Sequence, residues 1–310
     1  MLRGQRGLEG LKPIDLGLSL YPSYTLPLFR LENKKLAKLY GYAAKTVVEV
    51  FEDRVRCSGP GCSQETLRYW LGQWLCAMDA LDKVAGEGVK TLLKAYHNVG
   101  VIASPQDVEA VAVTVFLSRN TDYHTNTVRW ARRLFAECLD DRGKLDTYCA
   151  KKTLLLLGNS YQLKQLAEIL EDLLAILQQG YSSIWDLRYE LLKLKHVGPK
   201  TTDAIILHTG LTGYATPSDT HYERITRRLA LLSQRVRKPE KQWCLQAEAY
   251  CLECRWKMVC LTGASILAFK QYSGLVQTIA YIHDKLYCVK RRCLECKLKN
   301  TCNKRMETKK

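Results

Sequence analysis

The stretch of residues 187–229 constrains the fold of this chain most, because helix signals and helix breaks alternate there at short intervals. The segment 196–198 interrupts a first helix, and Pro199 stands where the first position of a second helix accepts proline, since no N–H donor is needed there. The apolar run 204–207 predicts that the second helix is buried. We therefore expect two helices joined by a tight hairpin, then a loop and a third helix that begins near Asp219. The apolar face of the first helix carries Leu187, Leu191, Leu192 and Leu194.

Two residues of this stretch suggest chemistry. Lys200 lies in the first turn of the second helix, where the positive end of the helix dipole disfavours an ammonium group. We therefore expect the pKa of Lys200 to be lowered, which would leave more free amine for nucleophilic attack. Asp219 lies at a helix start beside Thr220 and His221. A surface lysine and an N-cap aspartate are the simpler interpretation of the same two residues.

The residues LKHVGPKTTDAIILHTG, followed by SDTHYERITRRL, resemble the helix-hairpin-helix and Gly/Pro-Asp loop of the base-excision DNA glycosylase superfamily. In that family a lysine after the hairpin and an aspartate in a DTH segment are catalytic, so the resemblance implies these roles for Lys200 and Asp219. It also implies that the hairpin binds DNA through His196, Gly198 and Thr201. The family usually has a glycine where this chain has His196, so the hairpin departs from the family pattern there.

A polar segment follows the apolar run 108–117, which we expect to form a central buried helix. The glycosylase family has, at the matching position, a loop that fills the gap left by a flipped nucleotide. The resemblance therefore implies that Arg119 and Asn120 contact DNA. A solvated helix end is the alternative interpretation of these residues.

The chain of 310 residues carries a formal net charge of +16, which favours a polyanionic partner. Nucleic acid is the first candidate and an anionic membrane surface the second. Apolar runs stay well short of the ~20 residues of a membrane span, and the first residues lack the apolar core of a signal peptide. We expect an intracellular monomer of the cytoplasm or nucleoid with no membrane partner. The resemblance implies duplex DNA containing a damaged base as its partner.

Among the 13 cysteines are two quartets in the C-terminal part of the chain, and thiolates at such short spacings can ligate one metal ion or one cluster. The upstream quartet has the spacing C-x6-C-x2-C-x5-C, and the C-terminal quartet has C-x4-C-x2-C-x5-C. Both contain CLEC followed by five residues and a further cysteine, which indicates an internal repeat. The quartets are Cys244, Cys251, Cys254 and Cys260 upstream, and Cys288, Cys293, Cys296 and Cys302 at the end.

The segment AYIHDKLYC before the C-terminal quartet resembles the one that leads into the [4Fe-4S] loop of endonuclease III. The spacing of that family is found in full in the upstream quartet, whereas the first gap of the C-terminal quartet is two residues shorter. The resemblance implies a structural, DNA-facing [4Fe-4S] cluster in the C-terminal quartet. Three arrangements stay open: two clusters, one cluster with a zinc site, or one quartet left as reduced thiols or disulfides.

The N-terminal region differs from the rest of the chain. β-branched residues on both arms of the segment 46–57, around a turn near residues 52–53, predict a hairpin and hence a small antiparallel sheet. Cys57 and Cys62 could be a metal pair or a disulfide, and we favour two free thiols. An apolar stripe predicts one helix from Ser63 to Met78. The predicted domains are a small antiparallel β-domain over 1–62, a helical hairpin core over 63–235 and a cysteine-rich region over 236–310.

The order of sheet, helices and hairpin resembles the 8-oxoguanine and alkyl-adenine branches of the superfamily. The expected fold is therefore mainly α with a small N-terminal antiparallel β-domain, the helix-hairpin-helix glycosylase core and a C-terminal metal-cluster loop. The resemblance implies a bifunctional DNA glycosylase and abasic-site lyase for oxidised bases, with 8-oxoguanine slightly favoured. An endonuclease III-like enzyme for oxidised pyrimidines is the first alternative. A non-enzymatic DNA-binding module and an iron–sulfur electron-transfer protein are alternatives of other classes.

Overall fold

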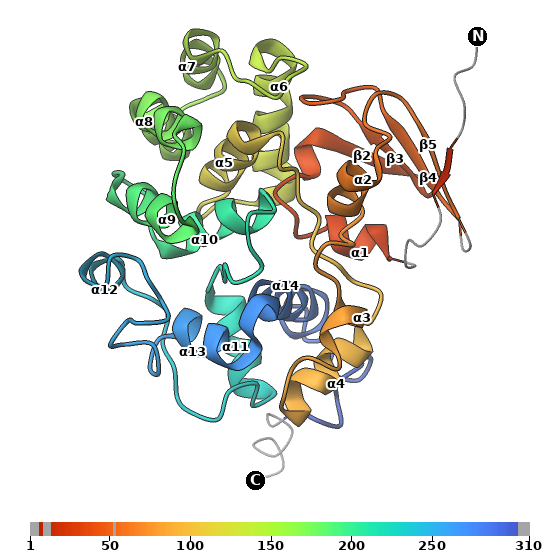
Figure 1. Ribbon diagram of the computed structural model, residues 1–310, viewed down its shortest axis with the longest axis vertical. Coiled ribbons are helices and arrows are strands. Elements are labelled where there is room, and N and C mark those ends of the chain that lie inside the picture. Colours follow the sequence, from red (N-terminus) through yellow and green to blue (C-terminus); the bar gives the residue numbers. More distant parts are fainter. Residues whose placement is uncertain (1–5, 9–13, 52–53, 303–310) are drawn as a thin grey trace.

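The computed structural model describes residues 6–8, 14–51 and 54–302, and it consists of a small sheet beside a larger helical body (Figure 1). The sheet is antiparallel throughout, with the strand order β1-β5-β4-β3-β2. The predicted mainly helical fold with an N-terminal antiparallel sheet is confirmed. Within the described ranges, no helix combines the length and the apolar character needed to cross a membrane. The strands are β1 (Arg6–Leu8), β2 (Phe29–Glu32), β3 (Lys35–Lys38), β4 (Val47–Val50) and β5 (Val55–Ser58).

The predicted hairpin corresponds to the antiparallel pair β4 and β5, and its expected turn at 52–53 lies outside the described residues. Cys57 and Cys62 form a disulfide, so the expectation of two free thiols is wrong. The turn after β5 brings their Cα atoms to 5.6 Å, which is within the range that a disulfide spans. A second disulfide joins Cys138 and Cys149, and it is not among the features predicted from the sequence.

Helices form most of the remaining chain. The first after the sheet, α2, ends at Trp70, so the predicted continuation to Met78 is wrong. Gly72 turns the chain there with a φ of +72°, and a Cβ at this position would lie 3.0 Å from the carbonyl carbon of Gly100. The helices are α1 (Leu16–Leu20), α2 (Gln64–Trp70), α3 (Ala77–Ala80), α4 (Glu87–Ala95), α5 (Val108–Leu117), α6 (Val128–Cys138), α7 (Thr147–Leu156), α8 (Tyr161–Gln178), α9 (Ile184–Lys193), α10 (Pro199–His208), α11 (Thr220–Arg228), α12 (Lys241–Gln246), α13 (Leu261–Phe269) and α14 (Ser273–His283).

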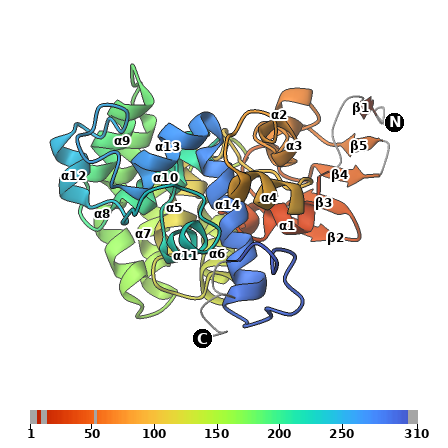
Figure 2. The same cartoon turned by 90° about the horizontal axis from the view of Figure 1, so that it is seen from below.

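Two large apolar cores, beside a small third cluster, are found in the described part of the chain, and α10 contributes to both large ones. One core joins the sheet to α2 and α5–α9, and the other lies among α3, α4, α11, α13 and α14. Within α10, residues 204–205 pack in the first core and residues 206–207 in the second. Figure 2 shows α10, α11 and α14 between the sheet at one end and α8 and α9 at the other. The first turn of α10 therefore lies at the junction of the two halves.

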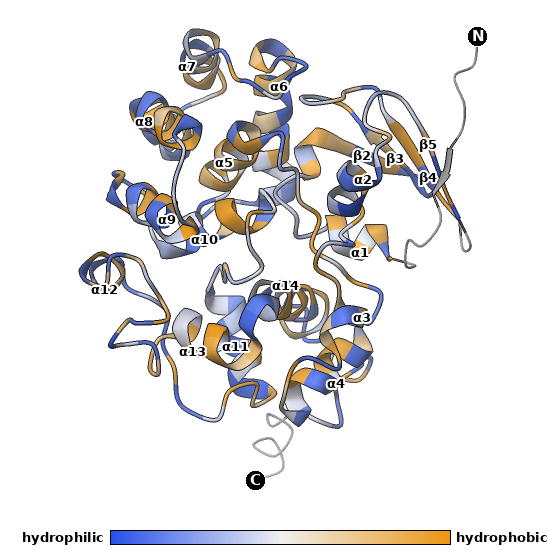
Figure 3. Ribbon diagram, in the orientation of Figure 1, coloured by the Kyte–Doolittle hydropathy of each residue, from blue (hydrophilic) through white to orange (hydrophobic). Residues whose placement is uncertain are grey.

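The central helix α5 is buried as predicted. Residues 109–117 are all buried, and Figure 3 shows α5 as largely apolar. This helix packs against α6, α8 and α10, so it supports the hairpin helix from behind. Its C-terminal end delivers the polar residues 118–121 to the same junction that α10 reaches.

Candidate active site

The first turns of α10 and α11 face one cleft with a volume of about 580 Å³. Lys200 and Asp219 both line this cleft, so the fold brings together the two residues that the sequence pairs as catalytic. Segments far apart in the chain supply the other walls. The lining residues are Pro22, Tyr24, Ser118, Arg119, Asn120, Thr121, Asp122, Tyr123, His124, Gly198, Pro199, Lys200, Thr201, Ser218, Asp219, Thr220, His221, Lys238, Pro239, Tyr281 and Lys285.

The hairpin between α9 and α10 positions Lys200. Gly198 is the N-cap of α10 and Pro199 is its first residue, as the sequence predicts. A Cβ at Gly198 would meet no atom within 4 Å, so the approach to the first turn is open. The first N–H groups of a helix lack partners within the helix, and they make such a turn suited to an anion. Gly198 and Thr201 both line the cleft, whereas His196 does not.

His196 does not line the cleft and instead contacts the helices beside the hairpin. Its φ of +63° is a left-handed conformation that favours glycine. Both the ring and the backbone carbonyl of His196 have interaction partners in this conformation. Its Nε2 lies 3.1 Å from Oε2 of Glu168, and its carbonyl accepts a hydrogen bond of 2.6 Å from Arg119. Arg119 also donates to Oε1 of Gln165 at 2.7 Å, so its guanidinium braces the hairpin. Asn120, which is exposed, lines the cleft with a φ of +48°.

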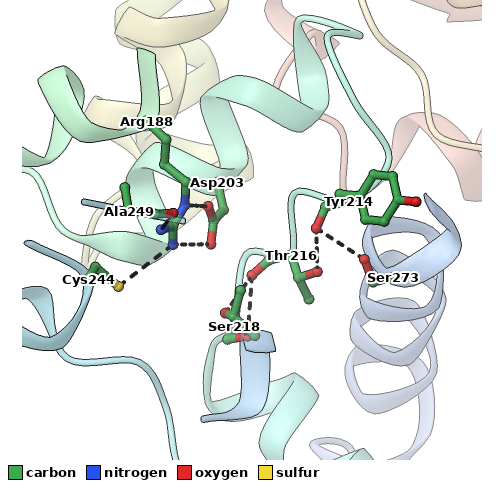
Figure 4. Close-up of polar contacts among 9 residues, drawn as sticks. Arg188, Asp203, Tyr214, Thr216, Ser218, Cys244, Ala249 and Ser273 are labelled. Atoms are coloured by element: carbon green, nitrogen blue, oxygen red, sulfur yellow. Dashed lines mark hydrogen bonds and ion pairs between the residues drawn. The ribbon is translucent and has the colours of Figure 1, made fainter. Parts of the chain in front are cut away.

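Asp219 is the N-cap of α11, and its carboxylate accepts a hydrogen bond of 2.8 Å from the backbone N–H of Tyr222. The loop before it is fastened by side-chain hydroxyls (Figure 4). Ser218 lies with its hydroxyl 3.3 Å from the carbonyl of Thr216, and the hydroxyl of Ser273 at the start of α14 donates to a loop carbonyl at 3.1 Å. The carboxylate is thus presented by a capped helix and a pinned loop.

The amine of Lys200 donates a hydrogen bond of 2.8 Å to the hydroxyl of Tyr24. Burial lowers the pKa of Lys200, but the Tyr24 oxygen and the Asp219 carboxylate together raise it by more, so the net shift is upward. The expected lowering of this pKa is therefore wrong, because two oxygen-bearing neighbours stabilise the ammonium form. The amine must lose a proton before it can act as a nucleophile.

Three tyrosines of the cleft, Tyr24, Tyr123 and Tyr281, are not among the site residues predicted from the sequence. Tyr24 and Tyr123 meet edge to face with ring centroids 5.5 Å apart. His221 packs against the ring of Tyr281 at 5.0 Å, and its Nδ1 lies 2.6 Å from Oδ2 of the buried Asp284. The position of His221 two residues after Asp219 was an available signal. The tyrosines lie outside the hairpin and DTH segments, and the fold alone brings them to the cleft.

The four cysteines of the upstream quartet line one cavity behind the hairpin helices. Arg188 of α9 lines it too, and its guanidinium forms a buried ion pair with Asp203 of α10 at 2.6 Å (Figure 4). The same guanidinium donates to the carbonyl of Ala249 at 2.9 Å and lies 3.8 Å from Sγ of Cys244. Burial raises the pKa of the Cys251 thiol to about 12. The upstream quartet is therefore tied to the helix that carries Lys200.

The C-terminal quartet lines a second cavity of about 390 Å³, and residues of α11 and α14 form its walls. Arg228 of α11 and His283 of α14 are among them, and His283 Nε2 lies 3.5 Å from Sγ of Cys296. Across the described part of the chain, no group of three or more His, Cys, Asp or Glu side chains stands in a metal-binding arrangement. Each quartet nevertheless lines one cavity with four cysteines, beside Arg188 in the upstream cavity and Arg228 and Arg291 in the C-terminal one, and thiolates are ligands that a metal ion or cluster can use.

Comparison with known proteins identifies the fold. No protein-family model matches the chain, and no curated protein matches it. A structure of MBOgg1 in complex with a low-affinity DNA ligand matches with 16% identity and a TM-score of 0.58, over 91% of this chain and 99% of that one. A Clostridium acetobutylicum 8-oxoguanine glycosylase/lyase, in complex with double-stranded DNA containing cytosine opposite 8-oxoguanine, matches with 12% identity and a TM-score of 0.57, over 92% and 98%. The 3-methyladenine DNA glycosylase of Archaeoglobus fulgidus matches with 12% identity and a TM-score of 0.56, over 90% and 98%. The chain therefore has the fold of the helix-hairpin-helix DNA glycosylases.

Proposed function

We propose that the protein is a bifunctional DNA glycosylase and abasic-site lyase that excises an oxidised base from duplex DNA. The observation that carries this proposal is the shared cleft of Lys200 and Asp219, at the starts of two helices in a DNA glycosylase fold. A module that only binds DNA needs the open helix start at Gly198 but has no use for an amine and a carboxylate in the same cleft.

In the proposed reaction a damaged nucleotide is flipped out of the duplex into this cleft. Lys200, once deprotonated, attacks C1′ of the sugar, and the bond from C1′ to the base breaks with its electron pair leaving on the base, which takes up a proton. Opening of the sugar ring gives a Schiff base between Lys200 and C1′. Loss of a proton from C2′ then expels the 3′ phosphate by β-elimination. Asp219 stabilises the positive charge that develops on the sugar and accepts or returns protons.

The remaining contacts would hold DNA. The first turn of α10, with Gly198 and Thr201, suits a backbone phosphate, because its N–H groups point along the positive end of the helix dipole. The exposed Asn120 suits the gap that a flipped nucleotide leaves, and Arg119 and His196 act by bracing the hairpin. The net charge of +16 favours the same polyanionic partner.

Among oxidised bases we favour 8-oxoguanine. The solved structures that match over nearly the whole chain include 8-oxoguanine glycosylase/lyases, and this chain carries an antiparallel sheet before its helical body. An enzyme for oxidised pyrimidines, like endonuclease III, is the alternative within the same reaction type, and the C-terminal cysteines favour it.

The test is a panel of duplexes, each carrying one lesion: 8-oxoguanine, thymine glycol, uracil, hypoxanthine or an abasic site. We expect excision of 8-oxoguanine to be fastest and borohydride to trap a covalent enzyme–DNA adduct. Lys200→Ala should abolish both while DNA binding survives, and Lys35→Ala, at an exposed lysine of the sheet, should change neither. A Lys200→Ala protein that still cross-links, or a wild-type protein that neither excises a base nor cleaves abasic DNA, would overturn the proposal.

We further propose that each cysteine quartet is a metal centre, with a [4Fe-4S] cluster in the C-terminal one and a second cluster or a zinc ion in the upstream one. When bound, such a centre supplies a rigid cross-link between segments of the chain. Four sulfur atoms around each cavity support the assignment.

We expect visible absorbance together with iron, or iron and zinc, in the purified protein. Cys251→Ser should remove the upstream metal only and Cys296→Ser the C-terminal metal only, so each variant is the control of the other. Protein purified without air that contains neither metal would refute this proposal.

A further inference from the structure

Tyr24 reaches the cleft from the segment between α1 and β2, 176 residues before Lys200 in the chain. Its hydroxyl accepts the hydrogen bond of 2.8 Å from the Lys200 amine, and the same amine lies 5.2 Å from the centroid of the Tyr24 ring. The amine therefore lies at the hydroxyl end of the ring, where the oxygen attracts the ammonium form of this lysine.

The ring of Tyr24 is fixed from two sides. It meets His208 of α10 edge to face at 5.0 Å and Tyr123 in the same manner at 5.5 Å. The preceding residue, Ser23, is buried, and its hydroxyl donates to the carbonyl of Ile102 at 2.9 Å while its own carbonyl accepts a hydrogen bond of 2.5 Å from Tyr123. Tyr24 is thus a preorganised partner rather than a surface side chain that happens to reach Lys200.

A lysine side chain has high rotamer freedom, and fixing it in one geometry costs about 2 kcal/mol. A nucleophile misplaced by about 1 Å can lose on the order of 100-fold in rate. On the premise that the proposed Schiff-base chemistry is correct, we propose that Tyr24 is the positioning residue that holds the Lys200 amine at the cleft and sets the pH at which it becomes reactive.

The groups that face Lys200 make the direction of this effect definite. Tyr24 and Asp219 raise the pKa of Lys200, whereas burial and Arg119 lower it. Burial lowers the pKa of His208 to about 4, so the ring beneath Tyr24 is neutral at working pH. Removal of the Tyr24 oxygen takes away a contribution that raises the pKa of Lys200, while burial and Arg119 still lower it. The pKa of Lys200 therefore falls. The other titratable groups of the cleft are Asp122, Tyr123, His124, His221, Lys238, Tyr281 and Lys285.

The test is Tyr24→Phe, which keeps the ring against His208 and removes only the hydroxyl. The rate of borohydride trapping on abasic DNA is measured against pH, together with the labelling of Lys200 by trace acetic anhydride in the absence of DNA, read by mass spectrometry. We expect the rate to rise with pH in the wild type as the ammonium loses its proton. In Tyr24→Phe the rising limb and the labelling midpoint should both move to lower pH, and the plateau rate should fall roughly tenfold.

The control is Tyr40→Phe, which removes a phenol hydroxyl from a tyrosine outside the cleft and should leave both curves unchanged. A wild-type protein that forms no trapped adduct contradicts the proposed function, and the labelling curves then still decide whether Tyr24 sets the pKa of Lys200. A wild-type protein that forms the adduct, beside a Tyr24→Phe protein with the same plateau and the same midpoints, contradicts the role of Tyr24 alone.

Discussion

The helices α10 and α11 present their first turns to the same cleft, yet they are supported differently. Asp203 of α10 is paired with Arg188, and both side chains are at most 2% exposed. On α11, Arg224 pairs with the buried Asp284 but is itself 33% exposed, and His221 shares the same carboxylate. The amine of the candidate pair is therefore carried by a helix that a fully buried ion pair supports. The carboxylate is carried by a helix whose support is partly open to water.

The two cysteine quartets repeat this contrast. The upstream quartet lines a cavity together with Arg188 of α9, which pairs with Asp203 of α10. The C-terminal quartet surrounds a larger cavity of about 390 Å³ against Ile225, Arg228 and Leu229, on the side of α11. The upstream copy of the CLEC pattern thus reaches α10 through the Arg188–Asp203 pair, whereas the C-terminal copy shares its cavity with residues of α11. Because the copies have nearly the same spacing, only the fold reveals that their surroundings differ.

Removal of Arg188 should give the largest loss of stability in this comparison. Arg188→Met leaves the Asp203 carboxylate buried without its partner, and breaking such a pair costs about 3–5 kcal/mol. We expect the midpoint of urea unfolding to fall accordingly. Arg224→Met, the matched change on α11, should cost less, because Asp284 keeps its hydrogen bond to His221 and the lost side chain is partly solvated.

The double variant Arg188→Met with Asp203→Leu completes this test. It removes both charges, so no unpaired carboxylate remains, and it should recover much of the stability that Arg188→Met loses. Equal losses of stability for the Arg188 and Arg224 variants would show that α10 and α11 are supported alike, which contradicts the difference between the two helices. If Arg188→Met does not fold at all, a double variant that does fold still shows that the unpaired Asp203 carboxylate causes the loss.

The hairpin and the site on it could be predicted from the sequence to different extents. Local signals suffice for Pro199 at the start of α10 and for Asp219 as a helix cap, because each depends on its own few neighbours. The pKa of Lys200 could not be predicted, since its direction depends on Tyr24, which is distant in the chain. The Arg188–Asp203 pair looks like two ordinary helix charges until α12 covers it.

The cysteines show the same limit. Spacing marks the two quartets, whereas the disulfide between Cys138 and Cys149 pairs residues at the end of α6 and the start of α7, whose approach depends on how these helices pack. The end of α2 at Trp70 depends on the contact of Gly72 with Gly100, another meeting that the apolar stripe does not encode. Spacing and capping patterns thus describe local geometry, and long-range packing decides the rest.

Asp219→Asn changes the carboxylate that α11 carries. Its expected free-energy effect is somewhat smaller than that of Arg188→Met. The amide can still accept the hydrogen bond of Tyr222, so α11 keeps its cap and the protein should unfold as the wild type does. The lost charge should slow base excision by about 10²–10³, or about 2.7–4 kcal/mol of transition-state stabilisation. Single-turnover excision of 8-oxoguanine measures this, and Asp186→Asn, at an exposed carboxylate of α9 outside the cleft, is the control.

Because Asp219 also raises the pKa of Lys200, the variant should reach its trapping plateau at lower pH than the wild type. Trapping on an abasic site, where no base has to leave, should suffer less than excision. Equal losses of trapping and of excision would mean that Asp219 acts only through Lys200. The separate roles of the amine on α10 and the carboxylate on α11 would then be contradicted.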